Sequence, residues 1–232
     1  MIQVLYEDNH IIAVLKPAGV LSQGDMTGKP SIFDEVKNYL KEKYKKPGNV
    51  FLGLVHRLDK PVVGIMVFAK ISKGASRLSE QFRNHTIQKT YNAIVLGELK
   101  VKEGDLKEKV SKVSFFAEGF AKKSDKEILE AVKKATKTRT AELSYKVVKS
   151  NGKYSLLEIL PKTGRFHQIR IQMAELGHPI LGDKEYAKRG TDEWQDNNSI
   201  ALCATGLSFM SATGEKDINL KIDLPEEWSR YI

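Results

Sequence analysis

Residues 143–159 read LSYKVVKSNGKYSLLEI. Leu143, Tyr145 and Val147 alternate with other side chains, which is the period of a strand that buries one face. The Asn-Gly pair at 151–152 is a strong signal for a tight turn, because both residue types accept left-handed backbone. Tyr154, Leu156 and Ile159 supply apolar side chains on the return. The segment therefore predicts an antiparallel β-hairpin.

Further strands are predicted on both sides of this hairpin. Residues 62–69 (VVGIMVFA) are apolar almost without interruption, which is typical of a central strand covered on both faces. Shorter strands are expected at residues 4–6, 11–15 and 90–96, and after the hairpin near 199–203 and 217–222.

Three helices are predicted from start signals followed by an apolar period of 3.6 residues. Ser31 and Asp34 form a capping-box pattern, Ser72 is expected to cap the second helix, and the third follows Gly164 and ends at Gly177. The expected apolar faces are Phe33, Val36, Leu40 and Tyr44 in the first helix, Ala75, Leu78 and Phe82 in the second, and Phe166, Ile169, Met173 and Leu176 in the third. Separate helices among hairpin-forming strands favour an α+β fold over a doubly wound sheet.

The composition is that of a folded, basic chain. Its 232 residues include 38 Lys and Arg against 29 Asp and Glu, a formal charge of +9, and 41% are hydrophobic. This excludes a disordered chain, and no apolar run reaches the about 18 residues of a membrane span. The N-terminus lacks a signal-peptide pattern, and a single cysteine excludes a disulfide framework. We expect a soluble, cytoplasmic protein with a polyanionic partner, although many lysine-rich surfaces bind nothing.

Residues 98–140 are rich in lysine and poor in large apolar side chains. We interpret them as a surface excursion, with a helix near Lys126–Lys134, from a single domain that spans residues 1–232.

Two clusters could carry chemistry. His56-Arg57-Leu58-Asp59 lies on a loop that enters the most apolar strand, and a carboxylate beside an apolar strand is costly unless a cation pairs with it. The alternative is a plain turn with a surface ion pair. Arg165, His167, Gln168 and Arg170 crowd the start of the third helix, a ready site for an anion such as phosphate. The alternative there is an amphipathic helix with a solvated basic face.

Other kinds of site find little support. The five histidines show no metal-ligand spacing, and there is no glycine-rich phosphate loop or dinucleotide fingerprint. A Ser-His-Asp hydrolase would need a nucleophile elbow, and no Gly-x-Ser-x-Gly occurs. Tyr91, taken alone, is a packing residue of a strand.

Several motifs follow one another in a fixed order: Tyr6-Glu7-Asp8-Asn9-His10, Lys16-Pro17-Ala18-Gly19, His56-Arg57-Leu58-Asp59 with Gly64, Lys89-x-Tyr91, Thr163-Gly164-Arg165-Phe166-His167-Gln168-Ile169-Arg170, and Leu176-Gly177-His178-Pro179-Ile180-Leu181-Gly182-Asp183. Together they resemble the RluA-type family of RNA pseudouridine synthases. The resemblance covers nearly everything except residues 98–140.

The resemblance implies one catalytic domain, a mixed and largely antiparallel sheet flanked by helices, that isomerises uridine in RNA to pseudouridine without a cofactor or metal. Asp59 matches the family's catalytic aspartate, which either attacks C1′ or removes the C2′ proton. Arg170 matches its arginine partner, which we expect to lower the carboxyl pKa. Tyr91 matches a tyrosine expected to stack on the uracil and to take part in the proton transfer at C5.

The same resemblance implies contacts with ribosomal or transfer RNA. The target base has to leave its stack, and Arg57 matches the arginine that fills the vacated space. His56, Arg165, His167 and Gln168 are expected to hold neighbouring RNA, and the lysine-rich segment is a candidate for further contact. No membrane contact, no obligatory protein partner and no N-terminal S4-type domain are expected.

Departures from the family pattern leave the target nucleotide open. Val62-Val63 replace a Thr-Ser pair, Leu15 an Asn and Cys203 a His. The principal alternative is a non-catalytic RNA-binding relative. A glycoside hydrolase would need a second carboxylate near Asp59, for which Glu80 is a candidate, and a basic scaffold protein would explain only the charge.

Overall fold

The computed structural model describes residues 2–26, 28–110, 139–187, 194, 196 and 198–232. Their helices and strands, in chain order, are β1 (Gln3–Glu7), β2 (Ile11–Lys16), α1 (Ile32–Lys43), β3 (Gly53–Leu54), β4 (Val63–Ala69), α2 (Ser72–Arg83), β5 (Gln88–Leu96), β6 (Glu103–Val110), β7 (Arg139–Ser150), β8 (Tyr154–Pro161), α5 (Gln168–Glu175), β9 (Leu202–Met210), β10 (Asp217–Lys221) and the 3₁₀ helix η1 (Glu226–Arg230). No helix in these ranges is long and apolar enough to cross a membrane.

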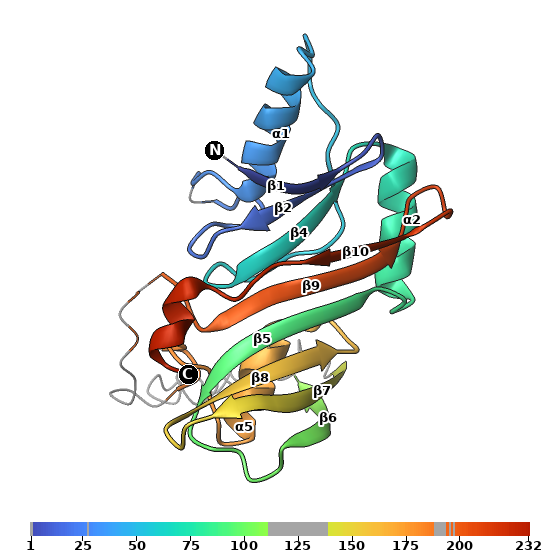
Figure 1. The fold of residues 1–232 in the computed structure, drawn as a ribbon. Coiled ribbons are helices and arrows are strands. Elements are labelled where there is room, and N and C mark those ends of the chain that lie inside the picture. Colours follow the sequence, from blue (N-terminus) through green and yellow to red (C-terminus); the bar gives the residue numbers. More distant parts are fainter. Residues whose placement is uncertain (1, 27, 111–138, 188–193, 195, 197) are drawn as a thin grey trace, which may run out of the picture.

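The strands form one sheet in the order β1-β2-β4-β9-β5-β8-β7-β6, with β3 and β10 paired to β4 and β9 (Figure 1). The pairing of β4 with β9 is parallel, and the other pairings between described strands are antiparallel. The predicted α+β class with a mixed, largely antiparallel sheet is therefore confirmed. Strand β9 lies between β4 and β5 and joins the two halves of the molecule.

Gly64 makes the junction of β4 with β9 possible. Its φ of +145° is favourable only for glycine, and a Cβ atom built there would lie 2.5 Å from the carbonyl oxygen of Ala204. We expect Gly64→Ala to lower the free energy of unfolding by about 2–3 kcal/mol, because backbone strain and overpacking add. Denaturant titration measures this loss. Gly48→Ala, at an exposed position with nothing within 4 Å, is the control, and equal stability of the two variants would contradict the prediction.

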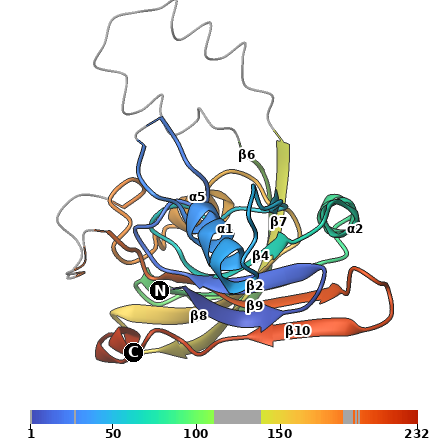
Figure 2. The same cartoon turned by 90° about the horizontal axis from the view of Figure 1, so that it is seen from above.

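Helices cover both faces of the sheet. In β2 and β4, Ile12 and Phe68 belong to one apolar core together with residues of α1 and α5, whereas Ile11 and Val67 belong to a second core with Leu78 of α2. Figures 1 and 2 show α1 over the N-terminal half of the sheet and α5 over the C-terminal half. The loops that precede β4 and α5 carry Asp59 and Arg165, which line one cavity.

Local signals predicted most of these elements. The capping box of Ser31 and Asp34 is present, and β7 and β8 form the predicted hairpin with Gly152 at φ +83°. Ser72 is the first residue of α2 and not its cap, since the N-cap is Ile71. The expected strand at 199–203 begins later, at Leu202, and continues to Met210.

The face expected for the third helix is only partly correct: Ile169 and Met173 are buried, whereas Phe166 and Leu176 are exposed. Helix α5 begins at Gln168, two residues after Phe166, so Phe166 lies in the preceding turn and is 42% exposed. Arg170 and Gln172 are buried as well, because side chains from elsewhere in the chain also cover their side of the helix.

The lysine-rich segment departs in part from the expected surface excursion. Residues 103–110 form β6, which pairs with β7 at the edge of the sheet. Its charged residues fit that place, because charge on an edge strand discourages pairing with other chains. The helix expected near Lys126–Lys134 lies outside the described residues.

Candidate active site

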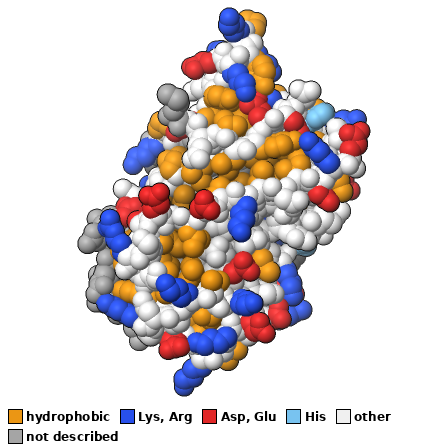
Figure 3. Space-filling view, in the orientation of Figure 1, with side chains coloured by type: hydrophobic (Ala, Val, Ile, Leu, Met, Phe, Trp, Pro, Cys, Tyr) orange, Lys and Arg blue, Asp and Glu red, His pale blue; other side chains and the backbone are white. Residues whose placement is uncertain are grey.

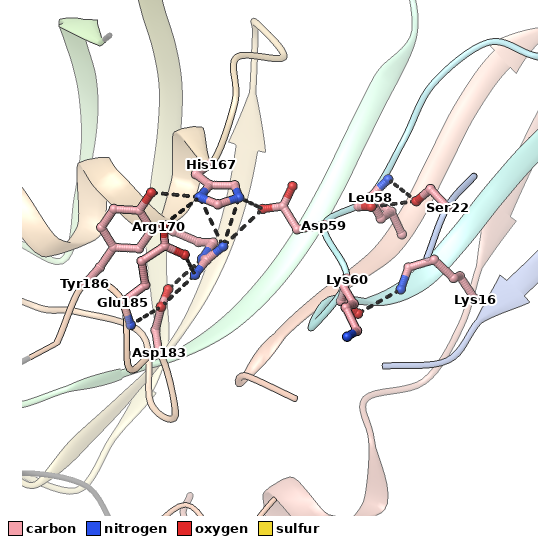
Figure 4. A network of polar contacts seen from close by, with 10 residues as sticks. All are labelled: Lys16, Ser22, Leu58, Asp59, Lys60, His167, Arg170, Asp183, Glu185 and Tyr186. Atoms are coloured by element: carbon pink, nitrogen blue, oxygen red, sulfur yellow. Dashed lines mark hydrogen bonds and ion pairs between the residues drawn. The ribbon is translucent and has the colours of Figure 1, made fainter. Parts of the chain in front are cut away.

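The loop that carries Asp59 is fastened to the segment after β2 (Figure 4). The Ser22 hydroxyl donates to the carbonyl of Leu58 at 2.5 Å and accepts from its amide at 3.0 Å. Lys16 is fully buried, and its Nζ donates to the carbonyl of Lys60 at 3.2 Å as well as to two carbonyls of its own loop. Leu58 and Lys60, the neighbours of Asp59 in the chain, are therefore each held by hydrogen bonds from a side chain to their backbone.

Arg170 faces Asp59 from the other side of the site. Its guanidinium is 5% exposed and forms a two-pronged bond to the buried carboxylate of Asp183, with Nε–Oδ2 at 2.7 Å and Nη2–Oδ1 at 2.8 Å. Nη2 also donates to Glu185 at 2.8 Å, and Nη1 lies 3.6 Å from Oδ2 of Asp59. Asp183 thus orients the guanidinium, and one edge of it remains directed at Asp59.

His167 lies beside the same carboxylate. Its Nε2 is 3.6 Å from Oδ2 of Asp59, and its Nδ1 is 2.7 Å from the hydroxyl of Tyr186. Phe166 stacks on the imidazole with ring centres 3.7 Å apart. The backbone of His167 is left-handed, with φ +49°.

A cavity of about 110 Å³ opens where these groups meet. Its lining includes Arg57, Asp59, Lys89, Tyr91, Arg165, His167, Gln168 and Arg170. Residues that are more than a hundred positions apart in the chain therefore share one small pocket. A larger hollow, of about 620 Å³, lies between α2 and the β9–β10 hairpin, and Glu80 lines that one.

Comparison with known sequences shows the family of the chain. The chain matches the profile of RNA pseudouridylate synthases over residues 10–175, which is more than half of its length. The chain belongs to the RNA pseudouridylate synthase family. The protein is accordingly an isomerase that converts uridine in RNA to pseudouridine.

Individual relatives agree with this assignment. The chain is 36% identical to tRNA pseudouridine synthase C of Vibrio cholerae, over 98% of this chain and 93% of the relative. It is 32% identical to ribosomal large subunit pseudouridine synthase C of Buchnera aphidicola, over 99% of this chain and 69% of the relative. The human protein RNA pseudouridylate synthase domain containing 4 shares the fold, with a TM-score of 0.75 at 21% identity over 98% of this chain and 90% of that one.

Burial and neighbouring charges in the synthase pocket act on the pKa of Asp59 in opposite directions. Burial raises the pKa of its carboxyl group above the ordinary 3.8, and the nearby Arg170 opposes this rise without cancelling it. Arg170 thus lowers the pKa of Asp59 as expected, but the net shift is upward, because burial and the charges of Asp183 and Glu185 raise it. Burial likewise raises the pKa of the Tyr91 phenol and lowers that of Lys89 to about 8.

The raised pKa of Asp59 predicts an acid limit to synthase activity. Only the ionised carboxylate can attack carbon or accept a proton, so kcat/KM should fall as the pH drops through a value above 3.8. A pH profile of product formation between about pH 4 and 8 measures this limb, with circular dichroism at each pH as the control for folding. A profile that stays flat down to pH 4 would contradict the prediction.

The structure does not bring His56 to the pocket. Its ring stacks on Phe82, with ring centres 4.8 Å apart, and its Nε2 accepts a hydrogen bond from the amide of Val67. Burial lowers its pKa to about 3, so the ring is neutral and supports the scaffold. The Gln168 side chain is also used internally, since it bonds to Thr163, to the amide of Arg165 and to the carbonyl of Glu142.

Four residues of the site were not predicted as site residues. Asp183, Glu185 and Tyr186 contact Arg170 or His167, and the Nζ of Lys89 donates to the carbonyl of Thr163 on the pocket rim. Asp183 and Lys89 lie within the motifs that resemble the family, and this position could have identified them as site residues. Among the described residues, no group of three His, Cys, Asp or Glu side chains is placed to hold a metal ion.

Proposed function

We propose that this synthase modifies specific uridines of transfer RNA or large-subunit ribosomal RNA, with Asp59 as its catalytic carboxylate. The observation that carries the proposal is the position of Asp59, whose Oδ2 faces both Arg170 and His167 in a pocket that Tyr91 also lines. The relatives named above act on these two RNA classes. The proposal accordingly places the protein with these RNAs in the cytoplasm.

The small size of the pocket and the ring of Tyr91 in its lining suit a single base that has left its stack. A single uracil, extruded from the RNA, could lie against the ring of Tyr91 while its C1′ comes within reach of Asp59. The arginine charge helps to keep Asp59 ionised in an environment that otherwise favours its neutral form. Asp59 would then attack C1′ or remove the C2′ proton, the base would turn, and C5 would join C1′.

The cations around the pocket are suited to the RNA backbone. Arg57 is exposed on the rim, and Arg165 and Lys89 line the same cavity. On the face shown in Figure 3, in contrast, lysines and arginines are scattered among acidic and hydrophobic side chains without a continuous basic band. We therefore place RNA at the pocket, and treat the residues of the chain, 1–232, as one catalytic domain built on one sheet.

The test is release of tritium from RNA labelled as [5-³H]uridine, because isomerisation frees the hydrogen at C5. Unmodified transfer RNA and large-subunit ribosomal RNA are incubated with the protein separately. Release from one class supports the proposal and identifies the substrate. Absence of release from both, with RNA binding intact, would favour the non-catalytic RNA-binding relative.

Arg57 is expected to affect turnover and not folding. Its side chain is exposed and forms no hydrogen bond or ion pair with other described residues, so Arg57→Ala should change stability by less than about 0.5 kcal/mol. If Arg57 fills the space of the extruded base, kcat/KM should fall about tenfold to a hundredfold. Lys60→Ala removes an equal charge nearby and is the control. Equal activity of the two variants, or a large loss of stability for Arg57→Ala, would count against this role.

A further inference from the structure

Polar contacts link Asp59 through His167 to Tyr186 (Figure 4). Oδ2 of Asp59 lies 3.6 Å from Nε2 of His167, and Nδ1 of His167 lies 2.7 Å from the hydroxyl of Tyr186. Tyr186 is hydrogen-bonded to Glu185, whose carboxylate also lies 3.6 Å from Nδ1 and is 38% exposed. The four groups therefore connect the interior of the pocket with solvent.

The isomerisation has to move a proton along some such route. When C5 has joined C1′, the C5–H bond breaks and its electron pair forms the C5–C6 double bond. The electron pair of the C6–N1 double bond passes to N1, which takes a proton from water. The proton released at C5 needs a base in the pocket. Tyr91 is a poor candidate, because burial raises the pKa of its phenol and keeps it protonated.

We propose that His167 is an acid–base residue of this reaction, which takes from Asp59 the proton that leaves C5 and passes it through Tyr186 and Glu185 to water. The proposal rests on the proposed role of Asp59. The transfer breaks the O–H bond of protonated Asp59 and forms N–H at Nε2, while the proton on Nδ1 moves to the Tyr186 oxygen as the Tyr186 proton moves to Glu185. Each donor receives one proton and gives one, and the imidazole is left with its proton on Nε2 instead of Nδ1. Before the next turnover Nε2 gives this proton to water and Nδ1 takes one from water, which restores the starting tautomer.

The hydrogen bonding around His167 is arranged for this transfer. Because Tyr186 donates to Glu185, its oxygen accepts from Nδ1–H. The lone pair of Nε2 then faces Nη1 of Arg170 at 3.1 Å and Oδ2 of Asp59 at 3.6 Å, so a small shift of Asp59 toward Nε2 brings the two groups into contact. The contact between Nε2 and Asp59 is long, as catalytic contacts often are before substrate binds. Tyr186 also holds Arg170, whose guanidinium carbon lies 4.8 Å from the centre of its ring.

The charges near His167 can accommodate a transient imidazolium. The guanidinium of Arg170 lies 3.1 Å from Nε2 and opposes a second positive charge. Three carboxylates, from Asp59, Asp183 and Glu185, surround these two side chains. Phe166, which stacks on the ring, and Tyr186 are neutral neighbours.

The backbone at His167 gives an independent reason to assign it a function. Its φ of +49° lies in the left-handed region, where glycine is at ease and other residues carry strain. A glycine would suit this turn, yet the position holds an imidazole directed at Asp59. The same conformation makes His167→Gly a variant that preserves the fold, because it removes the ring and relieves the backbone.

The test compares single-turnover rates of His167→Gly and Tyr186→Phe with two matched controls. His85→Gly removes an exposed histidine that also has a left-handed backbone, at φ +57°. Tyr44→Phe removes a hydroxyl that is bound to Glu7, far along the chain from this network. At saturating enzyme, where differences in RNA affinity do not affect the rate, we expect both relay variants to lose on the order of a hundredfold in rate, and both controls to match the wild type.

Added imidazole separates an acid–base role from a structural one. It should raise the single-turnover rate of His167→Gly at least about tenfold. It should not change the rate of Tyr186→Phe, whose imidazole is still present. Rates of the relay variants equal to the controls, or a His167→Gly variant that imidazole does not rescue, would overturn the proposal. If wild-type protein releases no tritium from any RNA, the proposed function fails instead, so the two failures are distinguishable.

Discussion

Asp59→Asn should reduce tritium release from [5-³H]uridine RNA to less than about a thousandth of the wild-type rate, which corresponds to about 4 kcal/mol of lost transition-state stabilisation. The amide is nearly the same size as the carboxylate, but it can neither attack C1′ nor accept the C2′ proton. Single-turnover kinetics at saturating enzyme measure this loss without interference from product release. RNA binding, measured by filter retention, should stay close to that of the wild type.

The control for this variant is its own stability. The pKa of Asp59 is raised in the folded protein, so the folded state holds this proton more tightly than the unfolded state does. Ionisation at neutral pH therefore costs stability, and Asp59→Asn removes that cost. We expect a melting temperature equal to or above that of the wild type. An active Asp59→Asn variant, or one that has lost its fold, would contradict the assignment.

Arg170→Met should lower the free energy of unfolding by about 3–5 kcal/mol, because it leaves the carboxylate of Asp183 buried without its partner. For a chain of this length that corresponds to a fall in melting temperature of roughly 10 °C. Thermal unfolding followed by circular dichroism measures the change. Activity should be lost as well, since the guanidinium edge that faces Asp59 is gone.

The matched control removes both charges. Arg170→Met combined with Asp183→Leu replaces a buried ion pair by apolar side chains, and this should recover most of the lost stability. It should not recover activity, because Asp59 still lacks its arginine. A single variant that is within about 1 kcal/mol of the wild type would show that Asp183 finds another partner or water. Restored activity in the double variant would argue against a role of Arg170 at Asp59.

Local patterns predicted the parts of the fold that local physics determines. The Asn-Gly turn and the capping box of Ser31 depend on neighbours within a few residues, and both occur as predicted. The buried face of α5 does not depend on such neighbours. Arg170 is buried because Asp183 pairs with it. A search for apolar residues at helical spacing misses this, and it wrongly places Phe166 on the buried face.

The sequence predicted which residues line the site, but not the net shift in the pKa of Asp59. The family resemblance selected Asp59, Tyr91 and Arg170, and these residues line one pocket. The pKa of Asp59 follows from the balance between burial and several charges at given distances, which residue types alone do not supply. His56 stands three residues before Asp59, yet its ring packs on Phe82, and adjacency in sequence gave no sign of that direction.

The place of β9 in the sheet has a consequence for how the protein is made. Residues 202–210 fill the gap between β4 and β5, so most of the chain has to be synthesised before the two halves can join. Until then β4 and β5 each present an unpaired edge, which is a template for association with other chains. Closure of such long-range pairings is slow. Catalytic competence is thus acquired only when β9 inserts between β4 and β5, and nascent chains that end before Leu202 lack this junction.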